Sequence, residues 1–138
     1  MADYLADVRF RDGQYIRILI IEEEVLVRAA LVALVKSWKG FRIVAEAATK
    51  AEALEQFRRV HPYVVLLSLA GTKDAALVPE ISRACGRTRL LVLFSHCPED
   101  LRLVMRGLAK RVVAKTEQPE ELKKAIQDIY GNGRTRRR

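Results

Sequence analysis

The segment 61–71, with the sequence HPYVVLLSLAG, restricts the fold of this chain more than any other. Between Pro62 and Gly71 it is apolar or aromatic at every position except Ser68. A run this short, closed by proline and glycine, is typical of a strand buried on both faces. We therefore expect Ser68 at the carboxyl end of a central strand, where an open α/β sheet presents its functional groups.

Further apolar runs and helical periods alternate along the rest of the chain. Strands are expected at 16–21, 41–47, 90–94 and 111–114, and helices at 25–37, 51–60, 79–85, 98–105 and 120–130. Thr49 is the expected cap of the second helix, and Gly131 the expected stop of the last. Strict alternation predicts a doubly wound parallel sheet with helices on both faces.

The length of 138 residues fits one domain. We expect a weakly ordered leader at 1–15, a folded body at 16–130 and a basic tail or linker stub at 131–138. The net charge of +8 includes four arginines of that tail, Arg134, Arg136, Arg137 and Arg138. The tail could bind nucleic-acid phosphates, but a linker or a solvated end is the favoured interpretation.

Two features of the sequence favour a location inside the cell and away from the membrane. Cys85 and Cys97 lack the spacing of metal ligands and are interpreted as reduced thiols. The apolar run at 16–21 is interrupted by Arg17 and is too short for a signal peptide or a membrane span. We expect a cytoplasmic protein without a membrane partner.

The ends of three expected strands bring chemically useful side chains together. Glu22 and Glu23 follow the first strand, Ser68 closes the third and Lys115 follows the fifth. In a doubly wound sheet these ends meet where the strand order reverses. Two carboxylates, a hydroxyl and an ammonium group therefore share one predicted cleft.

At this point the sequence resembles a known family, the receiver domains of two-component response regulators, especially those joined to a helix-turn-helix output domain. The likeness spans about 16–130 and is carried by IRILIIEEEVLVRAAL, FRIVAEAATKAEALE, HPYVVLLSL and KTEQPEELKKAI. The resemblance implies a flavodoxin-like (βα)5 sheet with the strand order 2-1-3-4-5. It also implies a site in which an acid pair helps to hold Mg²⁺, an aspartate at the end of the third strand accepts a phosphoryl group and the fifth strand ends in a lysine.

By position, the acid pair corresponds to Glu22 and Glu23, the lysine to Lys115 and the phosphoacceptor to Ser68. A serine hydroxyl is a weak nucleophile without a base, and it offers Mg²⁺ no anionic oxygen. The glutamates are also one methylene longer than aspartates. We therefore predict weak or absent Mg²⁺ binding, no other cofactor and no acyl phosphate, as in a pseudo-receiver.

The positions that relay phosphorylation in the family also differ. Three residues are candidates for the family's Thr/Ser position at the end of the fourth strand. Alignment of the strand itself gives Phe94, and counting back from Lys115 without a gap gives Leu93. A shift of the alignment by one residue would give Ser95. The family's switch aromatic corresponds to Val112. With the acceptor lost, we expect Lys115 to pair with Glu22 or Glu23 and to donate a hydrogen bond to Ser68.

The leading hypothesis is a non-enzymatic signalling domain of a bacterial, transcriptional regulator. Its output would depend on a protein partner or a homodimer, with any DNA-binding domain outside this chain and no small-molecule substrate. The resemblance implies the fourth helix, fifth strand and fifth helix as the partner face, including Leu101, Met105, Arg106, Arg111, Lys124 and Asp128.

Two rival functions remain open. The domain could be an active phospho-switch that uses Ser68 or an adjacent glutamate as acceptor. It could instead bind nucleic acid through its arginine tail. For Ser68 as a nucleophile, neither His61 nor His96 is predicted at a strand end beside it.

Overall fold

The computed structural model of the chain describes residues 15–70, 74–115 and 117–136, and the side chains of 132–136 lie outside that description. Its order of elements is β1 (Ile16–Ile21), α2 (Val25–Lys36), β2 (Phe41–Ala47), α3 (Lys50–Val60), β3 (Val64–Leu69), α4 (Leu77–Cys85), a 3-10 turn (Arg87–Arg89), β4 (Leu90–Phe94), α5 (Glu99–Leu108), β5 (Arg111–Ala114) and α6 (Pro119–Arg136). The expected leader lies outside the described residues except for Tyr15, whose ring lies 4.2 Å from the guanidinium of Arg42.

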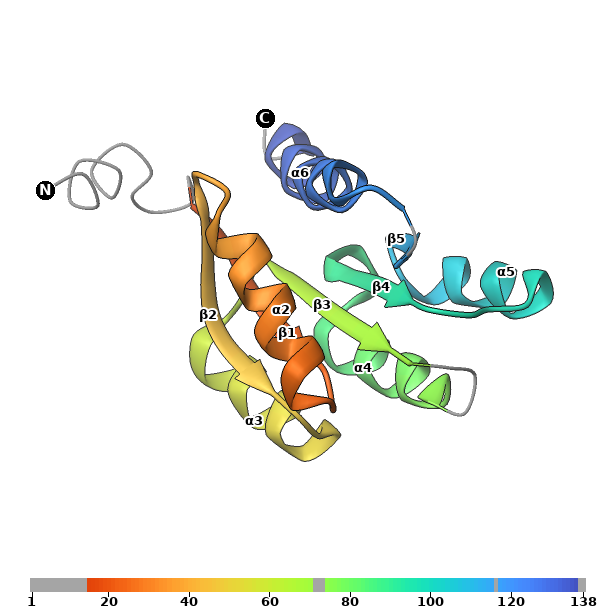
Figure 1. Ribbon diagram of the computed structural model, residues 1–138. Coiled ribbons are helices and arrows are strands. Elements are labelled where there is room, and N and C mark those ends of the chain that lie inside the picture. Colours follow the sequence, from red (N-terminus) through yellow and green to blue (C-terminus); the bar gives the residue numbers. More distant parts are fainter. Residues whose placement is uncertain (1–14, 71–73, 116, 137–138) are drawn as a thin grey trace, which may run out of the picture.

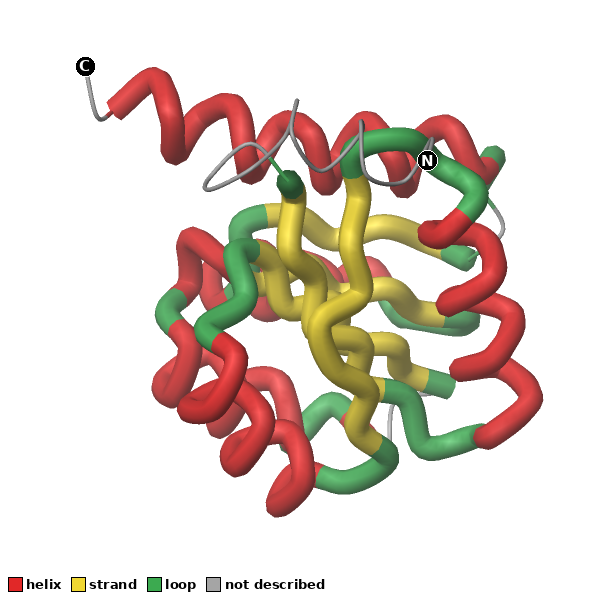
Figure 2. Tube along the Cα trace, turned by 90° about the vertical axis from the view of Figure 1, so that its left-hand side faces the viewer, coloured by secondary structure: helices red, strands yellow, loops and turns green. Residues whose placement is uncertain are grey.

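The strands form one parallel sheet in the order β2-β1-β3-β4-β5, and this confirms the predicted fold class. Figures 1 and 2 show the sheet between two layers of helices. Every residue of β3 is buried, as expected for the apolar segment between Pro62 and Gly71. Its neighbours on both sides are strands, so β3 has no edge that faces solvent.

The two faces of the sheet have separate cores because successive strand residues point in opposite directions. One core joins Ile18, Ile20, Leu66 and Leu93 to α2 and α6. The other core joins alternate strand residues to α3, α4 and α5. Burial of these aliphatic side chains stabilises the domain at roughly 25 cal/mol per Å² of apolar surface removed from water.

The helix starts follow their local signals. The Thr49 side chain accepts a hydrogen bond from the Glu52 N–H at 3.1 Å, as an N-cap does. Pro79 lies in the first turn of α4, where its missing N–H costs nothing. Pro98 precedes α5, which runs to Leu108 and so ends one turn later than predicted.

The predicted stop of the last helix at Gly131 is wrong. Helix α6 continues through this glycine to Arg136 and includes Arg134 of the basic tail. Glycine costs about 1 kcal/mol relative to alanine inside a helix, but it ends a helix only when it takes a left-handed conformation. Gly40 and Gly86 are the described glycines with positive φ, and Gly131 is not among them. Arg137 and Arg138 lie outside the described residues.

None of the helices in the described part of the chain is both long enough and apolar enough to cross a membrane.

Candidate functional site

Glu22 is the centre of the predicted site. It follows β1 directly, and only 2% of its surface is exposed. Its Oε1 accepts a hydrogen bond from the Ser68 hydroxyl, and its Oε2 accepts one from the Glu24 N–H at 2.9 Å. The backbone holds it in place, since its N–H donates to the Ala47 carbonyl and its own carbonyl accepts from Arg28. Both carboxylate oxygens of Glu22 are therefore occupied by partners within the chain.

Lys115 supplies the positive charge beside this carboxylate. Its Nζ lies 3.5 Å from Glu22 Oε1, and 22% of the Lys115 side chain is exposed. A buried carboxylate is costly unless it is paired and hydrogen-bonded, and Lys115 and Ser68 together meet both conditions. Of the two partners predicted for Lys115, the structure selects Glu22. The hydroxyl of Ser68 donates to Glu22, where the sequence led us to expect a hydrogen bond from Lys115.

Glu23 does not take part in this cluster, because its side chain is exposed. It lines the mouth of a small cavity of about 80 Å³ above the ends of β1 and β3. Lys50, on the same rim, pairs with Glu80 at 2.6 Å. Across the described residues, no group of three or more His, Cys, Asp or Glu side chains is arranged to hold a metal ion.

The register of β4 resolves which residue lies beside Ser68. In the β3–β4 ladder Ser68 is opposite Leu93, and Phe94 is opposite Leu69. Leu93 faces the α2 and α6 core, whereas Phe94 packs in the opposite core with its ring 5.3 Å from the Arg102 guanidinium. Neither Leu93 nor Phe94 is among the described residues that line the cavity at Ser68. Ser95 follows the strand and is half-buried.

The switch position and the predicted partner face differ in their exposure. Val112 packs against the core on the α3, α4 and α5 side. Lys124 and Arg106 are exposed, as a contact surface requires. Arg111 and Asp128 pair with each other at 3.0 Å across β5 and α6.

The apolar side chains that helix α5 exposes differ from those predicted from the sequence. Met105 is 2% exposed and belongs to the core, and Leu101 is half-buried. The exposed apolar residues are Leu103 and Val104, at 57% and 59%. The signal was present in the sequence, because DLRLVMRG carries four apolar residues and one helix face cannot bury them all.

The order of the five strands, with acids after β1, a polar side chain at the end of β3 and a lysine after β5, is similar to that of the receiver domains of response regulators. The comparisons with known proteins agree. The chain is homologous to the response regulator UvrY of Escherichia coli K12, with 27% identity over 122 residues, which are 86% of this chain and 56% of that protein. No protein-family model matches the chain.

Solved structures give the same result. A two-component response regulator of the LuxR family from Aurantimonas is similar with a TM-score of 0.75 and 26% identity, and the match covers 86% of each chain. The receiver domain of the putative response regulator NarL from Mycobacterium tuberculosis matches with a TM-score of 0.71 over 86% of this chain and 98% of that one. At 21% identity, this second likeness concerns the fold alone.

Proposed function

We propose that this receiver domain signals without being phosphorylated, through contacts with other proteins. The observation that carries the proposal is the Ser68–Glu22–Lys115 cluster. A receiver needs a free carboxylate to attack the phosphoryl donor and anionic oxygens to hold Mg²⁺. Here the acceptor position is a hydroxyl, and the buried acid that follows β1 is already paired with it and with Lys115.

The same cluster also favours one rival function. A hydroxyl that donates to a carboxylate has the arrangement of a nucleophile beside its base. Glu22, however, also accepts from Lys115 and from the Glu24 N–H, so its negative charge is shared among three donors and is not directed at Ser68 alone. We therefore rank phosphorylation of Ser68, or of Glu23 at the cavity mouth, below a phosphorylation-independent role.

Intact-mass measurement separates the two functions. The chain is incubated with a small acyl phosphate and Mg²⁺ and then weighed, and we expect no phosphoryl adduct. Stoichiometric phosphorylation that disappears in Ser68→Ala would establish the rival function. A Ser68→Asp variant is the control, because an adduct on this variant alone would assign the loss of reactivity to the serine.

We further propose that the domain belongs to a longer, non-enzymatic transcriptional regulator. The chain spans 56% of the length of UvrY, and a LuxR-family regulator is among the solved structures similar to it, at 26% identity. The face formed by α5, β5 and α6, now including Leu103 and Val104, is our proposed contact for a protein partner. An output domain that binds DNA would lie outside these 138 residues.

Binding measurements test the competing role of the arginine tail. We expect the 138-residue chain to bind double-stranded DNA only weakly, with an affinity that falls steeply with salt and is lost on deletion of residues 133–138. Tight binding that survives the deletion would assign a nucleic-acid site to the folded body.

A further inference from the structure

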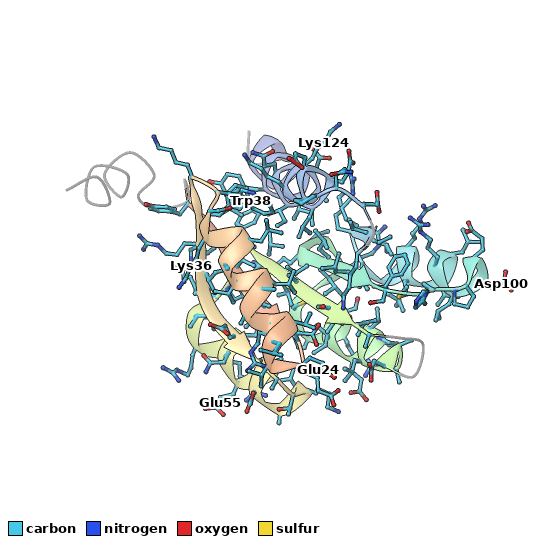
Figure 3. All side chains as sticks on the ribbon, in the orientation of Figure 1. Glu24, Lys36, Trp38, Glu55, Asp100 and Lys124 are labelled. Carbon is cyan, nitrogen blue, oxygen red and sulfur yellow. The ribbon has the colours of Figure 1, made fainter. Side chains whose placement is uncertain are left out.

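The edge of the sheet formed by the amino ends of its strands, opposite the candidate site, carries a dense group of basic side chains. Three segments reach this edge, at 56–63, 81–92 and 103–113. They contain two, three and three Arg or Lys residues, and none of them contains an aspartate or glutamate. Figure 3 shows a similar separation of charge along α2, with Glu24 at one end of the helix and Lys36 at the other. Helices α3, α4 and α5 have acids in their first turns, at the other edge of the sheet: Glu52, Glu80, Glu99 and Asp100.

The polarity of the helices explains only part of this pattern. A helix favours acids in its first turn and bases in its last turn, because its dipole is positive at the N-terminal end. Arg58, Arg59 and Arg83 are last-turn residues of this kind. The dipole does not account for three bases that lie outside the α-helices, in the connections that lead into β4 and β5: Arg87, Arg89 and Lys110.

Hydrogen bonds join these connections to the ends of two helices. Arg89 Nη1 donates to the carbonyl of Pro62, which follows α3, at 3.1 Å. Arg87 Nη2 donates to the carbonyl of Arg106, near the end of α5, also at 3.1 Å. The Lys110 N–H donates to the first carbonyl of β4, directly after the 3-10 turn, at 2.8 Å. The bases therefore form one continuous row from α3 to α5. We call it the amino-edge row and define it by Arg58, Arg59, Arg83, Arg87, Arg89 and Lys110.

The amino-edge row is open to solvent, and its charges are not neutralised within the described part of the chain. Five of its six residues are exposed, and Lys110 is half-buried. None of the ion pairs between described residues includes a member of the row. A guanidinium has five N–H donors, so Arg87 and Arg89 keep donors beyond the one that each gives to a carbonyl. Like charges gathered on one surface repel each other and attract an anionic partner.

The form of this edge favours the carboxylates of a protein over the phosphates of a nucleic acid. Guanidinium groups bind both anions through paired N–H donors. Single-stranded nucleic acid is held partly by stacking on aromatic rings, and no Phe, Tyr or Trp among the described residues is exposed. The major groove of DNA admits a helix or a β-ribbon, whereas this edge presents helix ends and a short turn. Clusters of arginine recurrently bind acidic peptide segments, which need neither feature.

We propose that the amino-edge row binds an acidic segment of a partner protein. Exposed charge pairs are individually weak and are screened by salt, so the contact is transient and depends on several bases together. The proposal extends the proposed signalling through protein contacts to a second surface. The row contains none of the residues named for the contact at α5, β5 and α6, so failure of one surface leaves the other unaffected. It also holds whether or not Ser68 accepts a phosphoryl group.

Fluorescence anisotropy of a labelled oligoglutamate peptide, titrated with the 138-residue chain, tests the proposal. We expect binding at about 50 mM salt that weakens at least about tenfold at about 300 mM salt. The double variant Arg58→Glu/Arg59→Glu reverses two charges of the row and should also weaken binding at least about tenfold. Absence of binding by the wild type at the lower salt concentration would overturn the proposal.

The matched control is the double variant Lys123→Glu/Lys124→Glu on α6. It makes the same change in net charge at another pair of adjacent bases, and it should weaken binding by less than about threefold. Equal losses in the two double variants would overturn the proposal, because binding would then follow net charge or the arginine tail rather than the row.

Amide chemical-shift mapping of the wild-type chain tests the location without any substitution that could disturb folding. Addition of the oligoglutamate peptide should shift amides at 58–61, 83–90 and 106–111. Shifts confined to the arginine tail or to the residues around Glu22 would overturn the proposal. A random-sequence DNA duplex is the comparison ligand, and shifts of the row by the duplex but not by the peptide would assign the row to nucleic acid and overturn the proposal as well.

Discussion

Replacing Ser68 by alanine tests whether the Glu22 cluster stabilises the domain as the structure indicates. Ser68 is 5% exposed, and its hydroxyl donates to the carboxylate of Glu22, a residue that is itself 2% exposed. A hydrogen bond to a charged group contributes about 1.5–3 kcal/mol, and its loss leaves a buried carboxylate oxygen with one partner fewer. Since Lys115 and the Glu24 N–H remain, we expect a loss of about 2 kcal/mol in the free energy of unfolding.

The assay is urea or thermal unfolding followed by circular dichroism. For a domain of this size, 1 kcal/mol corresponds to roughly 3–5 °C, so Ser68→Ala should lower the Tm by roughly 6–10 °C. Ser82→Ala is the matched control, because Ser82 is 9% exposed and its hydroxyl donates to a neutral carbonyl, that of Leu108, at 2.5 Å. This control should cost about 1 kcal/mol. If Ser68→Ala costs no more than Ser82→Ala, the charged cluster does not stabilise the fold as we describe.

Three further predictions follow from other parts of the structure. Burial raises the pKa of the Cys85 thiol to about 11, so this thiol should stay protonated near pH 8 and resist alkylation. The more exposed Cys97 should react first. Equal alkylation rates of the two thiols, measured by mass spectrometry, would contradict this order. Gly131→Ala should raise the free energy of unfolding by about 0.5–1 kcal/mol, because Gly131 is helical and an added Cβ would meet nothing within 4 Å. The measurement is urea unfolding, and a destabilised variant would place this glycine outside the helix. Arg111→Ala removes the ion pair with Asp128 and should change the free energy of unfolding by less than about 1 kcal/mol, since both side chains are about 40% exposed. A larger loss would reveal a further role for the pair.

The order and type of the strands and helices could be predicted from the amino-acid sequence. Apolar runs such as that of β3, the cap at Thr49 and the prolines at helix starts act over a few residues, so they are readable without the fold. Strict alternation of strands and helices then left a doubly wound parallel sheet as the expected architecture. The same reasoning placed Glu22, Ser68 and Lys115 at one edge of the sheet, and the structure brings these three together.

The pairing of these residues and the exposure of the helix surfaces depend on how the elements pack in three dimensions. The choice of Glu22 over Glu23 depends on side-chain direction after β1, and the choice of Leu93 beside Ser68 depends on strand register. Neither can be read from spacing, because a shift of one residue reverses the face of the sheet. The exposed apolar face of α2 could not be predicted from the sequence either. Its composition predicts a buried helix, and only the packed structure shows which side the sheet leaves uncovered.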